Sequence, residues 1–338
     1  MMEGKKPEFS IIVIFSRENY QTCLSSLLAQ KGVEFEIIAV VDNPSNIQEK
    51  DERIKWLVVK ENNPALRRNL AVKQAQAELV AFIDDDAWAE KDWLLQAKKI
   101  FDTRPELAGF GGVNIAPEEM SAREELVDLI LKDHIFGSGS KAYRKNSHPH
   151  PARAGEIHLC NFFLKKDILE QVGGFNEKIG YGAEDSELVY LIKKKLGKEI
   201  WFYPELWVWH QRRKFGWGYL KRNFRFRRNN GKLIWLYPEI YLWNHSLWAG
   251  LGSGVLGLIL LCLAPKIFFW LLLFYFAFFS FWSFFRLKRK WLFILAGFAY
   301  FLHHLSYLLG LFTGLLEGLI MGRTKLRQKF GRENFEPS

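Results

Sequence analysis

The chain has 338 residues with a formal net charge of +10, and 49% of them are hydrophobic. This length allows a full α/β domain and a further region. The three cysteines (Cys23, Cys160 and Cys262) are scattered, which indicates neither a disulfide framework nor a zinc site. The basic clusters border apolar segments, so they indicate a membrane surface as partner and argue against a nucleic acid.

Predicted strands and helices alternate along the first two-thirds of the chain. The apolar runs typical of buried strands are Phe9–Phe15, Phe35–Val41, Ile54–Val59, Leu79–Ile83 and Ile200–Val208. Apolar residues at helical spacing lie between several of these runs. This order predicts the α/β class, with an open, mostly parallel, doubly wound sheet. Ligands of such sheets bind at the carboxyl ends of the strands.

Acidic residues stand at two of these strand ends. Asp84, Asp85 and Asp86 directly follow the fourth predicted strand, and Asp42 follows the second. Adjacent carboxylates repel one another, and a shared divalent cation is the usual reason for a fold to keep them together. A solvated acidic turn is the alternative interpretation. The agreement between the two strand ends favours a nucleotide site.

A second acidic pair, Glu184-Asp185, opens a predicted helix that ends at Gly197. The simplest interpretation is structural: Asp185 caps the helix and Glu184 favours the helix dipole. The alternative interpretation is catalytic, because a carboxylate at this place can accept the proton of a hydroxyl group.

The order of these signals resembles the family 2 glycosyltransferases of the GT-A fold. The matching positions are Asp42, Arg68-Asn69, Asp84–Asp86 (a DxD motif), Gly173–Glu177, Glu184-Asp185 and His210. The resemblance spans residues 9 to about 230. It implies inverting transfer of a sugar from a nucleotide-diphospho-sugar, with Mg²⁺ or Mn²⁺ as the cofactor.

The resemblance also implies a role for each matching residue. Asp185 would be the catalytic base, and Glu184 beside it would orient the acceptor. Asp86, Asp84 and His210 would hold the metal ion. The residues that would form the nucleotide-sugar site are Ser16, Asp42, Arg68, Asn69, Asp84 and Asp85.

This chain departs from the family pattern at two places. The first strand of the family often ends in a Pro-Thr pair, where this chain has Phe15-Ser16. Processive members carry a Gln-x-x-Arg-Trp motif, where this chain has Gln-Arg-Arg-Lys-Phe at Gln211–Phe215. The second departure argues against a processive synthase.

Three other functions compete with this interpretation. Transfer to a polyprenyl phosphate needs no base, so the Glu184-Asp185 pair favours a hydroxyl acceptor over it. A sugar-phosphate nucleotidyltransferase usually has a Gly-rich loop after the first strand, which this chain lacks. A non-enzymatic membrane scaffold would have no need of carboxylates at both strand and helix ends.

The sequence divides into four regions. Residues 1–215 are predicted to form the GT-A domain, 216–245 amphipathic interfacial helices, 246–322 transmembrane helices, and 323–338 a basic cytoplasmic tail. The first apolar run is too short for a signal peptide. Together with the basic loop Arg286–Lys290, this predicts a multi-pass plasma-membrane protein with a cytoplasmic catalytic domain.

Three apolar stretches make up the predicted membrane region. Leu247–Ala264 and Ile267–Phe285 are each long enough to cross, with a turn at Pro265-Lys266. Trp291–Met321 is too long for one crossing and too short for two. We expect it to form a bent or re-entrant pair of short helices that returns the tail to the cytoplasm. The acceptor would then be a glycolipid, a lipid-linked oligosaccharide or a surface polysaccharide.

Overall fold

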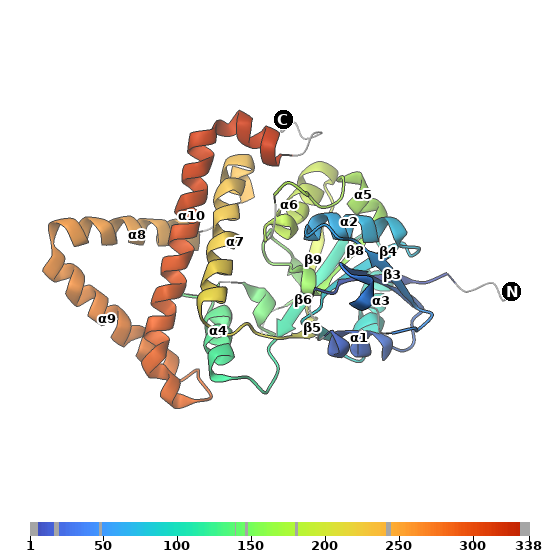
Figure 1. Cartoon of the computed structure of the whole chain (residues 1–338), viewed down its shortest axis with the longest axis horizontal. Coiled ribbons are helices and arrows are strands. Elements are labelled where there is room, and N and C mark those ends of the chain that lie inside the picture. Colours follow the sequence, from blue (N-terminus) through green and yellow to red (C-terminus); the bar gives the residue numbers. More distant parts are fainter. Residues whose placement is uncertain are drawn as a thin grey trace. The chain divides into compact units, whose positions relative to one another are not determined.

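The structure of the chain is a computed structural model (Figure 1). It describes residues 6–16, 20–46, 49–138, 140–145, 148–179, 182–240 and 245–331, with no account of the side chains at 245–251 and 253. Parts of the predicted interfacial region (241–244) and basic tail (332–338) lie outside these residues.

The chain forms two compact units, which are described separately. The first contains residues 1–117 and 141–211, and the second contains 118–140 and 212–338. The short segment 118–140 is therefore part of the C-terminal helical unit, although it interrupts the sequence of the first unit.

The first unit is built on a mixed sheet. Its strands are β1 (Phe9–Ile14), β2 (Phe35–Val41), β3 (Ile54–Val58), β4 (Leu79–Asp84), β5 (Ala87–Ala89), β6 (Gly109–Ile115), β7 (His150–Pro151), β8 (Phe162–Lys165) and β9 (Ile200–His210). Their order is β3-β2-β1-β4-β8-β6-β9-β5, and β7 pairs with β9. The first four strands run parallel to one another, as does β6 to β9, whereas β8 is antiparallel to both of its neighbours. The predicted α/β class is confirmed.

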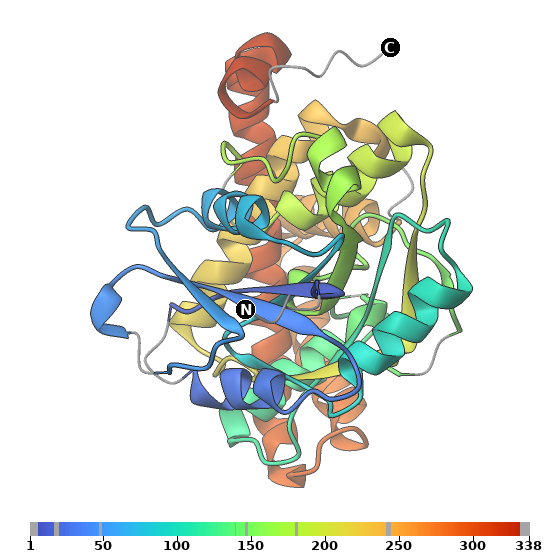
Figure 2. The same ribbon diagram turned by 90° about the vertical axis from the view of Figure 1, so that its right-hand side faces the viewer.

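Helices cover both faces of this sheet (Figure 2). They are α1 (Gln21–Leu28), α2 (Pro64–Gln74), α3 (Trp93–Thr103), α5 (Lys166–Gln171) and α6 (Glu184–Leu196). Apolar runs form the strands because both faces are buried, and aromatic rings fill the core between the layers. Phe163 is fully buried and lies 5.2 Å from Phe110 and 5.8 Å from Phe9 between ring centroids.

The second unit is helical. It contains α4 (Ala122–Lys132), α7 (Trp217–Leu236), α8 (His245–Leu263), α9 (Pro265–Phe284) and α10 (Phe293–Phe330). Arg212 is fully buried and its Nε donates to Asp128 Oδ1 of α4 at 2.8 Å. The Asp133 carboxylate that follows α4 accepts from Trp282 Nε1 of α9 and the Tyr300 hydroxyl of α10, both at 2.7 Å. These bonds fix the segment 118–140 in the helical unit.

Two helices are long and apolar enough to cross a membrane. They are Pro265–Phe284, with a mean hydropathy of 2.0, and Lys290–Phe330, with a mean hydropathy of 1.6. Within the first predicted crossing, Leu247–Ala264, the residues whose side chains are described include a shorter apolar helix, Gly254–Leu263. Together these helices indicate an association with membranes.

The prediction of two short helices within residues 291–321 is wrong. The stretch continues as a single helix, α10, and its non-helical backbone occurs later, at Gly322 (φ 68°, ψ 155°). No proline interrupts residues 293–321, so no interior backbone N–H donor is missing from this part of the helix.

Candidate active site

The candidate site begins with the parallel pairing of β1 and β4. Their register places Ile14 beside Asp84, so the loop after β1 adjoins the acidic triplet. Asp85 is buried, and its Oδ2 accepts hydrogen bonds from the Ser16 backbone N–H (2.8 Å) and hydroxyl (2.9 Å). Asp85 and Ser16 therefore hold this loop beside the end of β4, and a direct contact of either with a nucleotide-sugar stays a prediction.

The antiparallel pairing of β5 and β9 brings His210 to the triplet. Ala87 faces His210 in the register, and the Gln211 N–H donates to the Asp86 carbonyl at 2.8 Å. As a result, His210 Nε2 lies 3.3 Å from Asp86 Oδ1. The Asp86 side chain is 7% exposed, so this contact is largely shielded from water.

A possible metal-binding group lies next to this contact. One ligand atom each from Asp84, His210 and Cys160 lie within 4.8 Å of one another. The structure thus brings together the three predicted metal ligands, Asp84, Asp86 and His210. Their oxygen and nitrogen donors fit Mn²⁺ or Mg²⁺, whereas the thiol suits a softer metal.

Arg68 lies between the two acidic motifs. It is carried by α2, which begins at Pro64 and is capped by Asn63, whose side chain accepts from two backbone N–H groups. The guanidinium is 3.5 Å from Asp84 Oδ1 through one nitrogen and 3.3 Å from Glu184 Oε1 through the other. The Asp84 carboxylate at the end of β4 and the Glu184 carboxylate at the start of α6 therefore share the buried guanidinium group of Arg68.

Glu184 is occupied by its own helix end. Its Oε2 accepts the backbone N–H groups of Gly182 (2.6 Å) and Ala183 (2.9 Å), while Oε1 faces Arg68. The side chain is buried. These bonds fix Glu184 at the start of α6, and its contact with the acceptor stays a prediction.

Asp185 is the second residue of α6 and is partly buried; the N-cap of this helix is Ala183, so the interpretation of Asp185 as the cap is wrong. Its Oδ1 accepts the Ser186 N–H at 2.6 Å, a bond to the next residue along the chain. Burial, followed by the neighbouring Glu184 carboxylate, raises the pKa of Asp185 to about 7. A carboxyl group with that pKa is matched to exchange protons near neutral pH.

Asn69 is engaged by the glycine-rich loop after α5. Its Oδ1 accepts the Phe175 N–H at 2.7 Å, and its Nδ2 donates to the Phe175 carbonyl at 2.9 Å and to Glu177 at 2.8 Å. Gly174 has a φ of +74°, and a Cβ there would lie 2.7 Å from Asn69 Oδ1. Asn69 therefore holds this loop, and its predicted contact with the donor remains a prediction.

Asp42 is exposed at the end of β2, as a residue that binds a nucleotide base would be. The sheet order separates β2 from β4 by β1 alone, so Asp42 belongs to the same edge as the triplet. Its role also remains a prediction.

Sequence reasoning missed Cys160 and its supporting residue Asn161. The Asn161 side chain is fully buried, accepts from Trp93 Nε1 and donates to the Val113 and Leu206 carbonyls. This network fixes the short helix Leu159–Asn161, and thereby Cys160, near Asp84. The available signal was a Cys-Asn pair directly before the apolar run Phe162–Leu164.

Cys160 leads to a prediction about metal inhibition. We expect Cys160→Ser to keep Mn²⁺-supported activity but to raise the Cd²⁺ concentration for half-inhibition by about tenfold or more, because a thiol prefers the softer ion. The measurement is a Cd²⁺ titration of donor turnover, with Cys262→Ser as control. Equal Cd²⁺ sensitivity in all three proteins would show that the thiol does not face the metal position.

The fold and site together define a glycosyltransferase of the GT-A class. Residues 10–173 match the family model described as glycosyl transferase family 2. This stretch of the chain therefore belongs to the family 2 glycosyltransferases.

Relatives and a solved structure agree with this assignment. The chain is 22% identical to a glucosyl-dolichyl phosphate glucuronosyltransferase of Haloferax volcanii, over 63% of this chain and 75% of that protein. It is 24% identical to a putative teichuronic acid biosynthesis glycosyltransferase of Bacillus subtilis, over 60% of this chain and 88% of that protein. Relatives above 30% identity match shorter stretches, covering 15% to 29% of their length.

The fold is similar to that of a mannosyltransferase of Pyrobaculum calidifontis in complex with GDP-Man and Mn²⁺. The TM-score is 0.58 at 17% identity, covering 90% of this chain and 88% of the other. At this identity the likeness shows the fold.

Proposed function

We propose that this protein is an inverting, metal-dependent glycosyltransferase that moves a sugar from a nucleotide-diphospho-sugar to a hydroxyl group of a membrane-associated acceptor. The observation that carries the proposal is the position of Arg68. Its guanidinium touches both Asp84 of the acidic triplet and Glu184 of the second acidic pair. This shared contact supports the proposal that both motifs belong to one site, as transfer between a donor and an acceptor requires.

On the donor side, Asp86, Asp84 and His210 would hold Mn²⁺ or Mg²⁺. When bound, the cation would neutralise charge on the diphosphate leaving group. The predicted cofactor agrees with the Mn²⁺ and GDP-Man named for the Pyrobaculum mannosyltransferase. Asp42 would bind the nucleotide base, and Asp85 with Ser16 would hold the loop against the donor.

On the acceptor side, Asp185 would accept the proton of the attacking hydroxyl. Its pKa of about 7 lets it receive that proton near neutral pH and release it to water after transfer. Glu184, bonded to Arg68 and to the backbone, would keep the start of α6 fixed during the reaction. Attack from the side opposite the leaving group would invert the anomeric configuration.

The acceptor would be a glycolipid, a lipid-linked oligosaccharide or a surface polysaccharide. The Haloferax relative is named for a glucosyl-dolichyl phosphate, and the Bacillus relative for teichuronic acid. The first name refers to a lipid-linked sugar and the second to a polysaccharide, which supports these acceptor classes. The multi-pass topology with a cytoplasmic catalytic domain belongs to the same proposal, since nucleotide-sugars are then available to the site.

Product analysis tests this function. We expect purified full-length protein to transfer a labelled sugar from one of a panel of nucleotide-diphospho-sugars to a lipid extract, with activity lost in EDTA and restored by Mn²⁺. The product should have an inverted anomeric centre by NMR and a glycosidic bond stable to mild acid.

Three results would contradict parts of this account. A retained configuration would exclude direct attack by the acceptor. Release of the label by mild acid as the free monosaccharide would indicate that the sugar is bonded to a phosphate, and thus a polyprenyl-phosphate acceptor. Formation of a nucleoside triphosphate and a sugar 1-phosphate from the nucleotide-sugar and added pyrophosphate would indicate a nucleotidyltransferase.

A further inference from the structure

Helices α7 and α10 pack against each other at backbone distance. On α10, Gly310, Gly314 and Gly318 recur every fourth residue, and a Cβ at the first two would lie 2.3 Å and 2.0 Å from carbonyl oxygens of α7. Gly231 of α7 is also close to its partner helix: a Cβ there would lie 2.6 Å from the Leu311 carbonyl oxygen. Small residues at this spacing let two helices approach closely.

Polar contacts continue this pairing along both helices. The Tyr219 hydroxyl is 2.8 Å from His303 Nδ1, and Trp235 Nε1 donates to the Leu315 carbonyl at 2.9 Å. Glu317 of α10 also pairs with two basic residues of α7, Arg228 and Lys232. The partners advance in the same direction along both helices, so α7 and α10 run parallel and must share one orientation relative to any membrane.

The outward faces of the two helices have opposite character. On α10 before residue 321, the most exposed residues are all apolar: Trp291, Ile294, Leu295, Phe298, Leu305, Leu309, Phe312, Leu316, Leu319 and Ile320. On α7, Trp217 is exposed at the first position of the helix, and beyond its first turn the exposed residues are the basic Lys221 and Arg225, one turn apart. By helical periodicity, the apolar residues of α10 lie opposite the glycines that contact α7.

The length of α10 and the exposed charges of α7 both argue against α10 crossing the membrane. Its apolar part, residues 291–320, would measure about 45 Å at 1.5 Å per residue, whereas the hydrocarbon core is about 30 Å thick. A crossing α10 would also carry α7 to hydrocarbon depth, with its exposed Lys221 and Arg225. Exposed charges at that depth are strongly unfavourable.

We infer that α10 does not cross the bilayer but lies in the plane of its surface, with its apolar face in the hydrocarbon and α7 on the aqueous side. This inference rests on the membrane association proposed above. A helix with one apolar side and a basic neighbour on the other fits an anionic lipid surface.

The crossing would then be left to the hairpin of α8 and α9. Their 19 and 20 residues give lengths of about 28 Å and 30 Å, which match the hydrocarbon core. Figure 1 shows the two helices meeting away from α10, at the Pro265 turn. At the other end, α9 packs on α10 through Gly297, where a Cβ would lie 2.7 Å from the Phe276 carbonyl oxygen.

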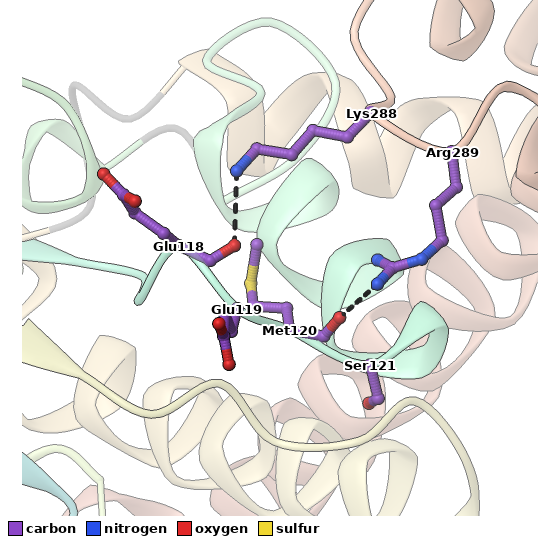
Figure 3. Close-up of a pocket in the computed structure, with 6 residues that line it drawn as sticks. All are labelled: Glu118, Glu119, Met120, Ser121, Lys288 and Arg289. Carbon is purple, nitrogen blue, oxygen red and sulfur yellow. Dashed lines mark hydrogen bonds between the residues drawn. The ribbon is translucent and has the colours of Figure 1, made fainter.

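Both ends of α10 are basic, which agrees with an in-plane helix. The loop before α10 is fixed by α4 and the segment before it: Lys288 Nζ donates to the Glu118 carbonyl and Arg289 to the Met120 carbonyl (Figure 3). Glu125 accepts the backbone N–H groups of both residues. After the kink at Gly322, the chain carries Arg323–Lys329. An in-plane α10 leaves both clusters on one side, as the positive-inside rule requires.

The test uses the full-length protein in membranes, with Cys262→Ser as background. We expect Lys288→Cys and Lys325→Cys to be labelled by an impermeant maleimide from the same side, and Lys266→Cys from the opposite side. Labelling of Lys288→Cys and Lys325→Cys from opposite sides would overturn the inference.

Depth measurements separate an in-plane helix from a re-entrant one. Fluorophores on Leu305→Cys, Phe312→Cys and Leu319→Cys should be quenched equally by lipids brominated at one acyl depth, and Arg225→Cys should not be quenched. A quenching profile that shifts steadily with depth across these α10 positions would contradict the inference. Absence of quenching everywhere, with release by alkaline carbonate, would instead refute the membrane association itself. Each variant is compared by melting temperature in detergent, so unfolding is recognised.

Discussion

Asp185→Asn is expected to lower turnover by roughly 10²–10⁴-fold and to leave donor binding nearly unchanged. Asp185 is the second residue of α6, and asparagine keeps its side-chain shape and the oxygen that accepts the Ser186 N–H, so a merely structural Asp185 would tolerate the change. It cannot accept the proton of the acceptor. Turnover and donor affinity, measured separately on the same preparations, distinguish the two roles.

The stability of this variant gives a second readout. Because the pKa of Asp185 is raised to about 7, the fold favours the protonated carboxyl, and a penalty grows as the pH rises from the usual value of 3.8 to about 7. Asparagine removes that penalty. The melting temperature at pH 8 should therefore equal or exceed that of the unmodified protein. Asp167→Asn, in the first turn of α5, is the matched control and should keep full activity.

Asp86→Ala is expected to abolish transfer and the Mn²⁺-dependent part of donor binding, while the protein still folds. Asp86 Oδ1 lies 3.3 Å from His210 Nε2, so the substitution removes one predicted ligand and releases the imidazole that it orients. The measurement is calorimetric binding of the nucleoside diphosphate with and without Mn²⁺.

Two further variants test whether the effect is specific to Asp86 and whether it depends on the charge of its side chain. Asp102→Ala removes an exposed carboxylate from α3 and should change nothing. Asp86→Asn keeps the side-chain volume and should resemble Asp86→Ala if charge is what matters. Unchanged Mn²⁺-dependent affinity in Asp86→Ala would refute the metal assignment.

The acidic triplet was predictable because its signal is local. An apolar run that ends in Asp84–Asp86 marks the end of a buried strand, and the structure puts Asp84 and Asp86 with His210 at one edge of the sheet. The spacing of Glu184-Asp185 before an apolar helix was local too. The α/β class followed from the alternation of these elements.

The supporting contacts were not predictable, because they depend on which strands pair. Strand β8 inserts antiparallel between β4 and β6, and this insertion brings Cys160 and Asn161 to the site. Similarly, the bond between Arg212 and Asp128 assigns α4 to the helical unit across a long sequence separation. The single helix α10 was missed because the length of the stretch was compared with the thickness of a bilayer, whereas its glycines pack against α7, a partner that the sequence does not reveal.

The pH dependence of kcat/KM tests the central claim most directly, namely that Asp185 activates an acceptor hydroxyl in a site shared with the metal ligands. The activity of the unmodified protein should rise about tenfold per pH unit up to a pKa near 7 and then level off. Asp185→Asn should lack that limb and stay low throughout. A limb at the same pH in both proteins, or full activity of Asp185→Asn, would contradict the account and favour a phosphate acceptor.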